Sequence, residues 1–190
     1  MGIIAALTGD PHGTIAAVHV KTEAGECRVV RLFRGPGIEA ALAGIPVTVP
    51  RGARHPEILI EGGEYIGGPN LAAAAVALVG KPVPDALGRP QRRTWSPYVI
   101  QTASADRLQN ASAWKTDVPR REVIAAFIDR LLRGAVKAQK DDPLAAYLKR
   151  GIEGLRAKRE TDDDKLNVHE DLALCLALCV WWSVISQSAR

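Results

Sequence analysis

The sequence predicts an α/β fold built on a mixed β-sheet that has one antiparallel wing. Three features of the chain lead to this class. Its opening segment holds three apolar stretches separated by glycine-containing turns, as in an antiparallel meander. Its middle alternates strand-like and helix-like segments, and its final part has the periodicity of helices. This order places parallel strands beside an antiparallel wing in one sheet flanked by helices.

The antiparallel wing is expected at residues 3–7, 14–20 and 27–33. The first two stretches are rich in Ile, Val and Ala and are separated by the turn TGDPHG at residues 8–13. The third stretch, CRVVRLF, alternates in polarity and follows the turn EAGE at residues 23–26. A hairpin followed by a third antiparallel strand is therefore predicted.

The remaining elements follow in chain order. We expect a helix at residues 38–43, a buried strand at 57–61, an alanine-rich helix at 70–79, a strand at 98–102, and helices at 119–132, 143–158 and 168–185. The helix at 119–132 begins with proline, which is favoured at the first helical position. Residues 81–97 contain four prolines and little periodicity, which predicts a loop.

Composition is typical of a globular protein with one domain, residues 1–190. Hydrophobic residues make up 47% and charged residues 24% of the chain, and the mean hydropathy is −0.02. The longest apolar run, residues 172–182, is shorter than the roughly 20 residues of a membrane span, and the N-terminus does not resemble a signal peptide. We therefore expect a cytoplasmic protein without a membrane partner. Because thiols stay reduced in the cytoplasm, Cys27, Cys175 and Cys179 are expected to be reduced residues of the core.

The basic excess is concentrated in one stretch of the chain. The formal net charge is +4, and residues 81–121 contain eight Lys or Arg against three acidic residues. Such a stretch can follow a phosphate backbone, and a solvated surface is the alternative interpretation. The candidate nucleic-acid contacts in it are Arg89, Arg92, Arg93, Arg120 and Arg121.

Acidic residues at the ends of apolar segments form the candidate site. Glu61 ends the strand EILIE and is followed by two glycines, which leave the backbone open to a ligand. Asp10 lies in the turn of the first hairpin, where an Asx turn is the structural alternative. Glu170 and Asp171 precede an apolar run, where helix capping is the alternative. Because that run is apolar on all sides, its helix must be buried and its acidic start would face the strand ends.

Three carboxylates from separate elements suit a two-metal phosphodiesterase. Mg²⁺ prefers carboxylate oxygens and keeps positions open for water and phosphate, while a pair of ions activates the nucleophile and stabilises the leaving oxygen. The sequence holds no His and Cys cluster that indicates zinc. It also holds no phosphate loop of an ATPase.

Four segments of the sequence carry a resemblance to a known family. They are ILIEGGEYIGGPN at residues 58–70, VPRREV at 118–123, Pro143-Leu144-Ala145 with Leu148, Glu153 and Leu155, and HEDLALCLALCVWW at 169–182. In that order they resemble the VVDYTGVGRPV segment, the VPK-x-x-L helix start, the next helix and the closing HDDLVLALALAVWW of one nuclease family. The family is the nuclease domain of phage terminase large subunits and related prophage proteins, which belongs to the ribonuclease H-like nucleases.

The resemblance implies a ribonuclease H-like fold and a divalent-metal-dependent DNA endonuclease of phage or prophage type. Asp10, Glu61 and Asp171 would bind Mg²⁺ or Mn²⁺, Glu170 would be the alternate third acid, and His169 would contact a phosphate or support a metal ligand. The implied partners are DNA, linear or branched, and proteins of phage packaging or recombination. RNA stays open as an alternative substrate.

The position of the first acid has two interpretations. The family has this acid directly after the first strand as D-x-G, and one gapless alignment puts Ala6 there while the other puts Asp10 there. The run GDPHGT at residues 9–14 is more similar to the D-P-G-x-x-T-G segment of RuvC-type Holliday junction resolvases, from the same superfamily, so we assign Asp10. With Ala6 at that position the site would lack a ligand.

Two other hypotheses stand beside the nuclease. The first is a catalytically inactive nucleic-acid-binding or assembly module that has kept the fold and lost the site. Whether the three acidic clusters converge in space discriminates between this module and the nuclease. The second is that Trp181 and Trp182, with the apolar helix, form the interface of a homo-oligomer.

Overall fold

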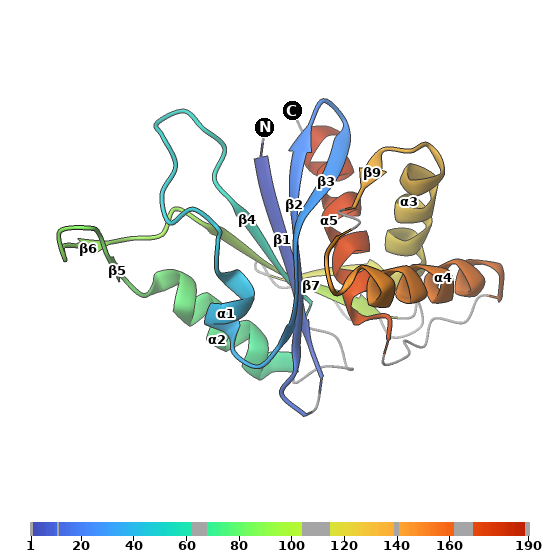
Figure 1. Cartoon of the computed structure of the whole chain (residues 1–190), viewed down its shortest axis with the longest axis horizontal. Coiled ribbons are helices and arrows are strands. Elements are labelled where there is room, and N and C mark those ends of the chain that lie inside the picture. The colour runs from blue at the N-terminus through green and yellow to red at the C-terminus, as the bar shows by residue number, and fades with distance from the viewer. Residues whose placement is uncertain are drawn as a thin grey trace.

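A seven-stranded mixed sheet forms the centre of the protein (Figure 1). The structure is a computed structural model that describes residues 2–10, 12–61, 68–103, 115–138, 141–161 and 169–188. The strand order is β8-β7-β4-β1-β2-β3-β9. β1 therefore lies between an antiparallel wing and a set of parallel strands, which confirms the fold class predicted from the sequence.

The antiparallel wing consists of β1 (Gly2–Gly9), β2 (Ile15–Glu23) and β3 (Glu26–Gly35). β1 pairs with β2 along its whole length, and β2 pairs with β3. The turn between β2 and β3 is Ala24-Gly25, with φ values of 47° and 84°. Tight hairpin turns require such left-handed values because they match the twist of the strands. The predicted hairpin and third strand are confirmed.

The parallel part of the sheet consists of β4 (Glu57–Glu61), β7 (Ser96–Ala103) and β8 (Lys115–Pro119), in order outward from β1. The two-residue β9 (Val136–Lys137) pairs in parallel with β3. β8 and β9 are too short and too polar for hydrophobic alternation to reveal them. Since β1, β4, β7 and β8 run in one direction, their carboxyl ends lie at one edge of the sheet, which we call the carboxyl edge.

A separate hairpin, β5 (Val83–Pro84) and β6 (Pro90–Gln91), occupies the segment predicted as a loop and projects away from the sheet (Figure 1). Asp85 orders its turn. Oδ1 of Asp85 accepts hydrogen bonds from the amides of Leu87 at 2.8 Å and Arg89 at 2.9 Å, and Oδ2 pairs with Arg89 Nε at 2.8 Å. These local polar contacts leave no hydrophobic pattern, so the sequence indicated a loop or excursion here but did not reveal the two short strands within it.

Helices cover both faces of the sheet (Figure 1). α3 (Arg120–Leu132), α4 (Ala145–Thr161) and α5 (Asp171–Ser188) lie on one side, and α1 (Ile38–Leu42) and α2 (Gly68–Gly80) lie on the other. The five predicted helices are confirmed, with ends shifted by up to three residues.

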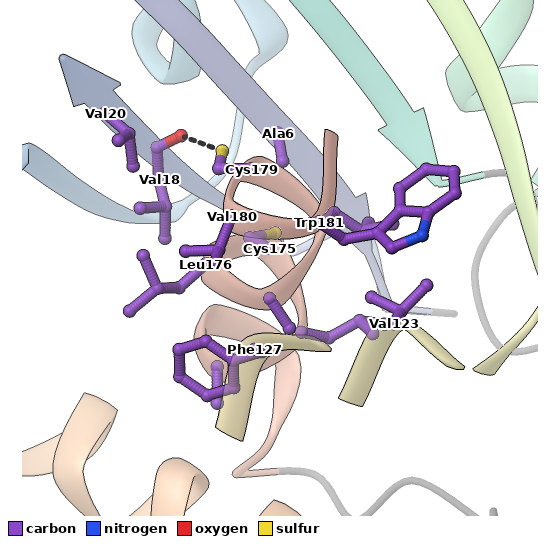
Figure 2. Close-up of a cluster of buried hydrophobic side chains, with 14 of the residues drawn as sticks. Ala6, Val18, Val20, Val123, Phe127, Cys175, Leu176, Cys179, Val180 and Trp181 are labelled. Atoms are coloured by element: carbon purple, nitrogen blue, oxygen red, sulfur yellow. Dashed lines mark hydrogen bonds between the residues drawn. The ribbon is translucent and has the colours of Figure 1, made fainter. Parts of the chain in front are cut away.

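The core on the α5 side contains every side chain from Leu172 to Val180. Figure 2 shows four of them packed with residues of the wing and of α3; it labels Cys175, Leu176, Cys179 and Val180 of α5, Ala6, Val18 and Val20 of the wing, and Val123 and Phe127 of α3. The three cysteines are free and buried, as predicted. Within the described residues, none of the helices combines the length and hydrophobicity that a membrane span needs.

His19 provides a test of the packing on the α1 side. Its ring is 3% exposed, and Nε2 donates a hydrogen bond to the carbonyl of Ala41 at 2.8 Å. Burial is the main cause that lowers the pKa of His19 from its ordinary 6.5 to about 4. Between these two pH values the unfolded chain binds more protons than the folded protein. Folding stability should therefore fall by up to about 3 kcal/mol as the pH drops from 7 to 4.

Urea unfolding at pH 7 and pH 4.5 measures this loss. His19→Gln should lose clearly less stability between the two pH values than the wild type does. His12→Gln, in an exposed turn, is the matched control. An equal effect of both substitutions on the pH dependence would contradict the assignment to His19.

Candidate active site

Glu61, the last residue of β4, is buried at the carboxyl edge. It shares with Leu59 the face of β4 that packs toward α5, and its side chain is 1% exposed. Its Oε1 accepts hydrogen bonds from the hydroxyl of Thr102 at 2.7 Å and from the amide of Thr102 at 3.2 Å. A buried carboxylate needs such donors because it has lost its hydration. The two bonds fix the carboxylate at the end of the strand.

Arg120, the first residue of α3, lies beside this carboxylate. Its Nε donates to the hydroxyl oxygen of Thr102 at 3.3 Å, and its Nη2 donates to the carbonyl of Thr102 at 2.9 Å. Thr102 therefore links the guanidinium to Glu61. Arg120 is 7% exposed, so this predicted phosphate contact directs its charge into the protein.

The thiols of α5 show how this helix runs along the sheet. Cys179 Sγ donates to the carbonyl of Val18 at 3.6 Å (Figure 2), and Cys175 Sγ, one turn earlier, donates to the carbonyl of Ala16 at 3.5 Å. Four helical residues rise about 6 Å, close to the rise of two strand residues. α5 thus advances in step with β2. Asp171, one further turn back, comes level with the β1–β2 turn at the carboxyl edge.

Asp171 and Glu61 both act on the thiol of Cys175. Burial is the largest cause that raises the pKa of Cys175 well above its ordinary value, the charge of Asp171 is the next, and Glu61 contributes as well. Two carboxylates from separate elements therefore lie within electrostatic range of one buried side chain. Both predicted acids lie at the carboxyl edge, Glu61 at the end of β4 and Asp171 at the start of α5.

Asp171 has charged and aromatic neighbours. Its Oδ2 pairs with Arg34 Nε at 2.9 Å, and its Oδ1 accepts the amide of Leu172 at 2.7 Å. The Arg34 guanidinium also lies 5.1 Å from the centre of the Tyr147 ring. Burial first, and then the charge of Asp171, raise the pKa of Tyr147 to about 12. Asp171, Arg34 and Tyr147 therefore form one partly exposed cluster.

Asp10 lies in the β1–β2 turn and is partly buried. Its Oδ1 accepts hydrogen bonds from the amides of His12 at 2.9 Å and Thr14 at 2.8 Å, which is the Asx-turn arrangement. Burial acts to raise the pKa of Asp10, but hydrogen bonds to Thr14 and His12 outweigh it and lower the pKa. The charged form of Asp10 is therefore favoured, and one of its oxygens is used by the turn.

Thr8 is the β1 residue that lies level with Glu61. The parallel register pairs Leu7 with Ile60, so Thr8 is the next position along β1. Thr8 is 1% exposed, and within the described residues its hydroxyl has no hydrogen-bond partner. Ala6, the alternative position for the first acid, is fully buried in the core. Asp10 stands two residues beyond Thr8, where the strand has ended.

Glu170 and His169 have different surroundings. Glu170 is 2% exposed, and its Oε2 pairs with Lys158 Nζ of α4 at 2.5 Å. A Cβ at Gly154 would overlap the Glu170 carboxylate, so glycine allows α4 to approach it closely. His169 is exposed and packs edge-on against the Tyr147 ring at 5.5 Å. Glu170 therefore joins two helices, whereas His169 lies on the surface beside the Asp171 cluster.

The donor chemistry at the carboxyl edge fits Mg²⁺ or Mn²⁺, whose protein ligands include carboxylate oxygens. Within the described residues, no three His, Cys, Asp or Glu side chains lie close enough together to hold one ion. Glu61 and Asp171 each bring a carboxylate to this edge of the sheet. Mg²⁺ commonly takes its remaining ligands from water and phosphate.

The other predicted phosphate contacts are divided between the carboxyl ends and the amino ends of the parallel strands. Arg121 is exposed at the start of α3, which follows the carboxyl end of β8. Arg89 and Arg92 are exposed in and just after the β5–β6 hairpin, before the amino end of β7. Arg93 is half-buried and donates to carbonyls at the C-terminal end of α2 at 2.7 and 2.5 Å. These five arginines do not share one surface.

The fold is similar to that of the terminase nuclease domain of human cytomegalovirus. A structure of that domain, soaked with Mn and with an inhibitor bound, aligns with a TM-score of 0.56 at 14% identity, covering 100% of this chain and 86% of that chain. Two further structures of the domain, one of them soaked with Mn, align with TM-scores of 0.48 and 0.49 at 13% and 14% identity, each over 95% of this chain and 81% of theirs. No family model and no curated protein matches the sequence. The chain has a ribonuclease H-like fold, which confirms the predicted resemblance at the level of the fold.

Four residues at the site were not singled out from the sequence. They are Arg34, Thr102, Tyr147 and Lys158. A signal existed for Arg34, since it ends the alternating strand CRVVRLFR directly before a Gly-Pro-Gly turn. No local pattern marks Thr102 or Lys158, whose acidic partners lie 41 and 12 residues away in the chain.

The buried pair of Glu170 and Lys158 should stabilise the fold. Lys158→Met and Glu170→Gln should each lower the free energy of unfolding by roughly 3–5 kcal/mol, because each leaves one charge or polar group buried without its partner. The double variant should lose less than the sum of the two. Urea unfolding of all four proteins measures this coupling.

The exposed pair of Lys137 and Glu26 is the matched control. Lys137→Met should change stability little, because solvent screens exposed pairs. Strictly additive losses at Glu170 and Lys158 would show that the two side chains do not stabilise each other.

Proposed function

We propose that this chain is a divalent-metal-dependent endonuclease that cleaves DNA. The observation that supports the proposal is the placement of two carboxylates at the carboxyl edge, since Glu61 ends β4 and Asp171 begins α5 level with the β1–β2 turn. In open α/β sheets this edge is where ligands bind. The ribonuclease H-like fold, similar to a Mn-soaked terminase nuclease domain, supports the same activity.

The chemistry would divide between the ion and the side chains. A divalent ion supplies an activated water and stabilises charge on the phosphate. Thr102 holds one oxygen of Glu61, and the amide of Leu172 holds one oxygen of Asp171, so both carboxylates are oriented before a ligand arrives. Asp10 would be the third acid, and Arg121 would bind the DNA backbone.

The same proposal includes the extent of the domain, its substrate and its partner proteins. Residues 1–190 would act as one nuclease domain of phage or prophage type. The substrate would be linear or branched DNA, and the partners would be proteins of phage packaging or recombination. Exposed His169 would contact a phosphate near Asp171, and Glu170 would serve the fold.

A second candidate function is a nucleic-acid-binding module without catalysis. Two observations favour it. Thr8, rather than an acid, lies level with Glu61 on β1, and Asp171 is already paired with Arg34. In such a module the carboxylates would stabilise the fold through these internal pairs.

Removing the charge of Glu61 or of Asp171 should greatly reduce the rate of cleavage. Even residues that only orient a metal ligand contribute about 10–100-fold, so Glu61→Gln and Asp171→Asn should each lower the cleavage rate by about 100-fold or more. Asp10→Asn should do the same if Asp10 is the third acid. The assay uses linear, supercoiled and four-way-junction DNA with Mg²⁺, Mn²⁺ or EDTA.

Glu153→Gln, at an exposed position of α4, is the control and should cleave as the wild type does. Melting temperatures of all variants separate lost chemistry from lost folding. If the wild type binds DNA but cleaves none of the three substrates with either metal, the non-catalytic module is the better description.

Salt dependence of DNA binding locates the nucleic-acid surface. Each phosphate contact contributes about 0.9 to the slope of log K against log salt. Arg121→Gln, at the carboxyl edge, should lower the slope by about 1, whereas Arg92→Gln, beyond the hairpin at the other edge, should leave it unchanged. The reverse result would place the nucleic acid across the β5–β6 hairpin.

A further inference from the structure

Arg34 is the basic residue that lies beside the predicted metal ligand Asp171. It lies near the end of β3 and pairs in register with Ala16 of β2, whose carbonyl accepts the Cys175 thiol. The sheet therefore presents Arg34 to the first turn of α5. Its Nε takes Oδ2 of Asp171, the oxygen that the Leu172 amide does not use.

The ion pair of Arg34 and Asp171 can be reached from solvent. The two side chains are 26% and 21% exposed, in contrast to 8% and 3% for the pair of Lys158 and Glu170. A partly exposed pair is held more weakly than its short distance suggests, because water and salt screen it. A small cation can therefore reach the Asp171 carboxylate and compete for it.

We propose that Arg34 is a phosphate-binding residue whose guanidinium a divalent cation displaces from Asp171. The inference rests on the proposed nuclease function. The guanidinium and the cation carry the same sign of charge and use the same carboxylate oxygen, so each lowers the affinity of the other. Once displaced, Arg34 is a cation with five N–H donors beside the metal, which suits the oxygens of a phosphodiester.

Tyr147 keeps the displaced guanidinium near the site. The Arg34 guanidinium lies over the Tyr147 ring at 5.1 Å, within the range of a cation–π interaction. Tyr147 is in the first turn of α4, and its ring is braced edge-on by His169 at 5.5 Å. Arg34 can therefore leave Asp171 without leaving the carboxyl edge.

The first experiment measures Mn²⁺ binding without DNA. Mn²⁺ is titrated into the wild type, Arg34→Gln and Arg31→Gln, and binding is followed by electron paramagnetic resonance and by the rise in melting temperature. Arg34→Gln should reach half-saturation at about twofold to fivefold lower Mn²⁺ than the wild type, because a competing cation of ion-pair strength is gone. Arg34→Lys should stay near the wild type.

Arg31→Gln is the matched control, since Arg31 is on the same strand and donates instead to the carbonyls of Ala40 and Ala43 beside α1. It removes the same charge and should leave the Mn²⁺ titration unchanged. Equal or weaker Mn²⁺ binding by Arg34→Gln would overturn the competition. An equal gain in Arg31→Gln would overturn it as well, because the effect would then reflect net charge alone.

The second experiment measures binding of a cleavage-resistant phosphorothioate duplex with Mn²⁺ and with EDTA. Arg34→Gln should lower the salt slope by about 1 in Mn²⁺ and leave it unchanged in EDTA, where Asp171 still holds the arginine in the wild type. Tyr147→Phe keeps the ring that holds the guanidinium, so it should keep the salt slope of the wild type in Mn²⁺ even though it removes the hydroxyl, which interacts with Asp171 and Arg34. Equal slopes for the wild type and Arg34→Gln in Mn²⁺ would overturn the phosphate-binding role.

Failure of this inference and failure of the proposed function give different results. A wild type that binds Mn²⁺ and cleaves DNA, with Arg34→Gln unchanged in both titrations, refutes the role of Arg34 alone. A wild type that binds no Mn²⁺ at millimolar concentration and cleaves no DNA refutes both. If Arg34→Gln fails to fold, Tyr147→Leu carries the test. It should lower the salt slope in Mn²⁺, because the displaced guanidinium loses the ring that keeps it near the phosphate.

Discussion

The packing of α5 along β1 and β2 is the constraint on which the carboxyl edge depends. The helix is apolar on all sides from Leu172 to Val180, so it is stable only where the sheet and α3 enclose it. Alanine and cysteine side chains let its backbone lie close to the strands, and the thiols reach strand carbonyls at 3.5–3.8 Å. Because a densely packed core resists sliding or rotation, the helix start is fixed in register with the β1–β2 turn. The position of Asp171 follows from this register.

A second consequence of burial is that each acid of the helix start and of β4 has a basic neighbour. Glu61 is joined to Arg120 through Thr102, Asp171 is paired with Arg34, and Glu170 is paired with Lys158. Desolvated charge is costly, so partners of opposite sign are expected wherever carboxylates enter the protein. Part of the basic excess of the chain is therefore internal. The formal charge of +4 does not describe the surface that a nucleic acid would meet.

The close packing of α4 against the start of α5 places the Tyr147 ring at the carboxyl edge. Gly151 and Gly154 lie against the start of α5, and a Cβ at Gly151 would stand 2.6 Å from the carbonyl oxygen of His169. Larger residues would push the two helices apart. The contact brings Tyr147 beside Arg34 and places Lys158 in reach of Glu170. Two glycines in one helix thus help to shape both the partly exposed ion pair of Arg34 with Asp171 and the buried ion pair of Lys158 with Glu170.

The sequence by itself determined the order and type of most elements. Apolar stretches and turn residues identify β1, β2, β3, β4 and β7, and the five helices follow from periodicity and from Pro119, because these signals act over a few neighbouring residues. The same local pattern pointed to Glu61 and Asp171, since an acid that ends an apolar strand or begins an apolar helix is visible in the chain.

Tertiary structure alone decided which charged residues contact one another. Strand register put Thr8 level with Glu61, helix packing put Arg34 on Asp171, and Arg120 turned inward toward Thr102. These contacts join residues far apart in the chain, and no local pattern encodes them, because they arise only when the sheet and helices pack together.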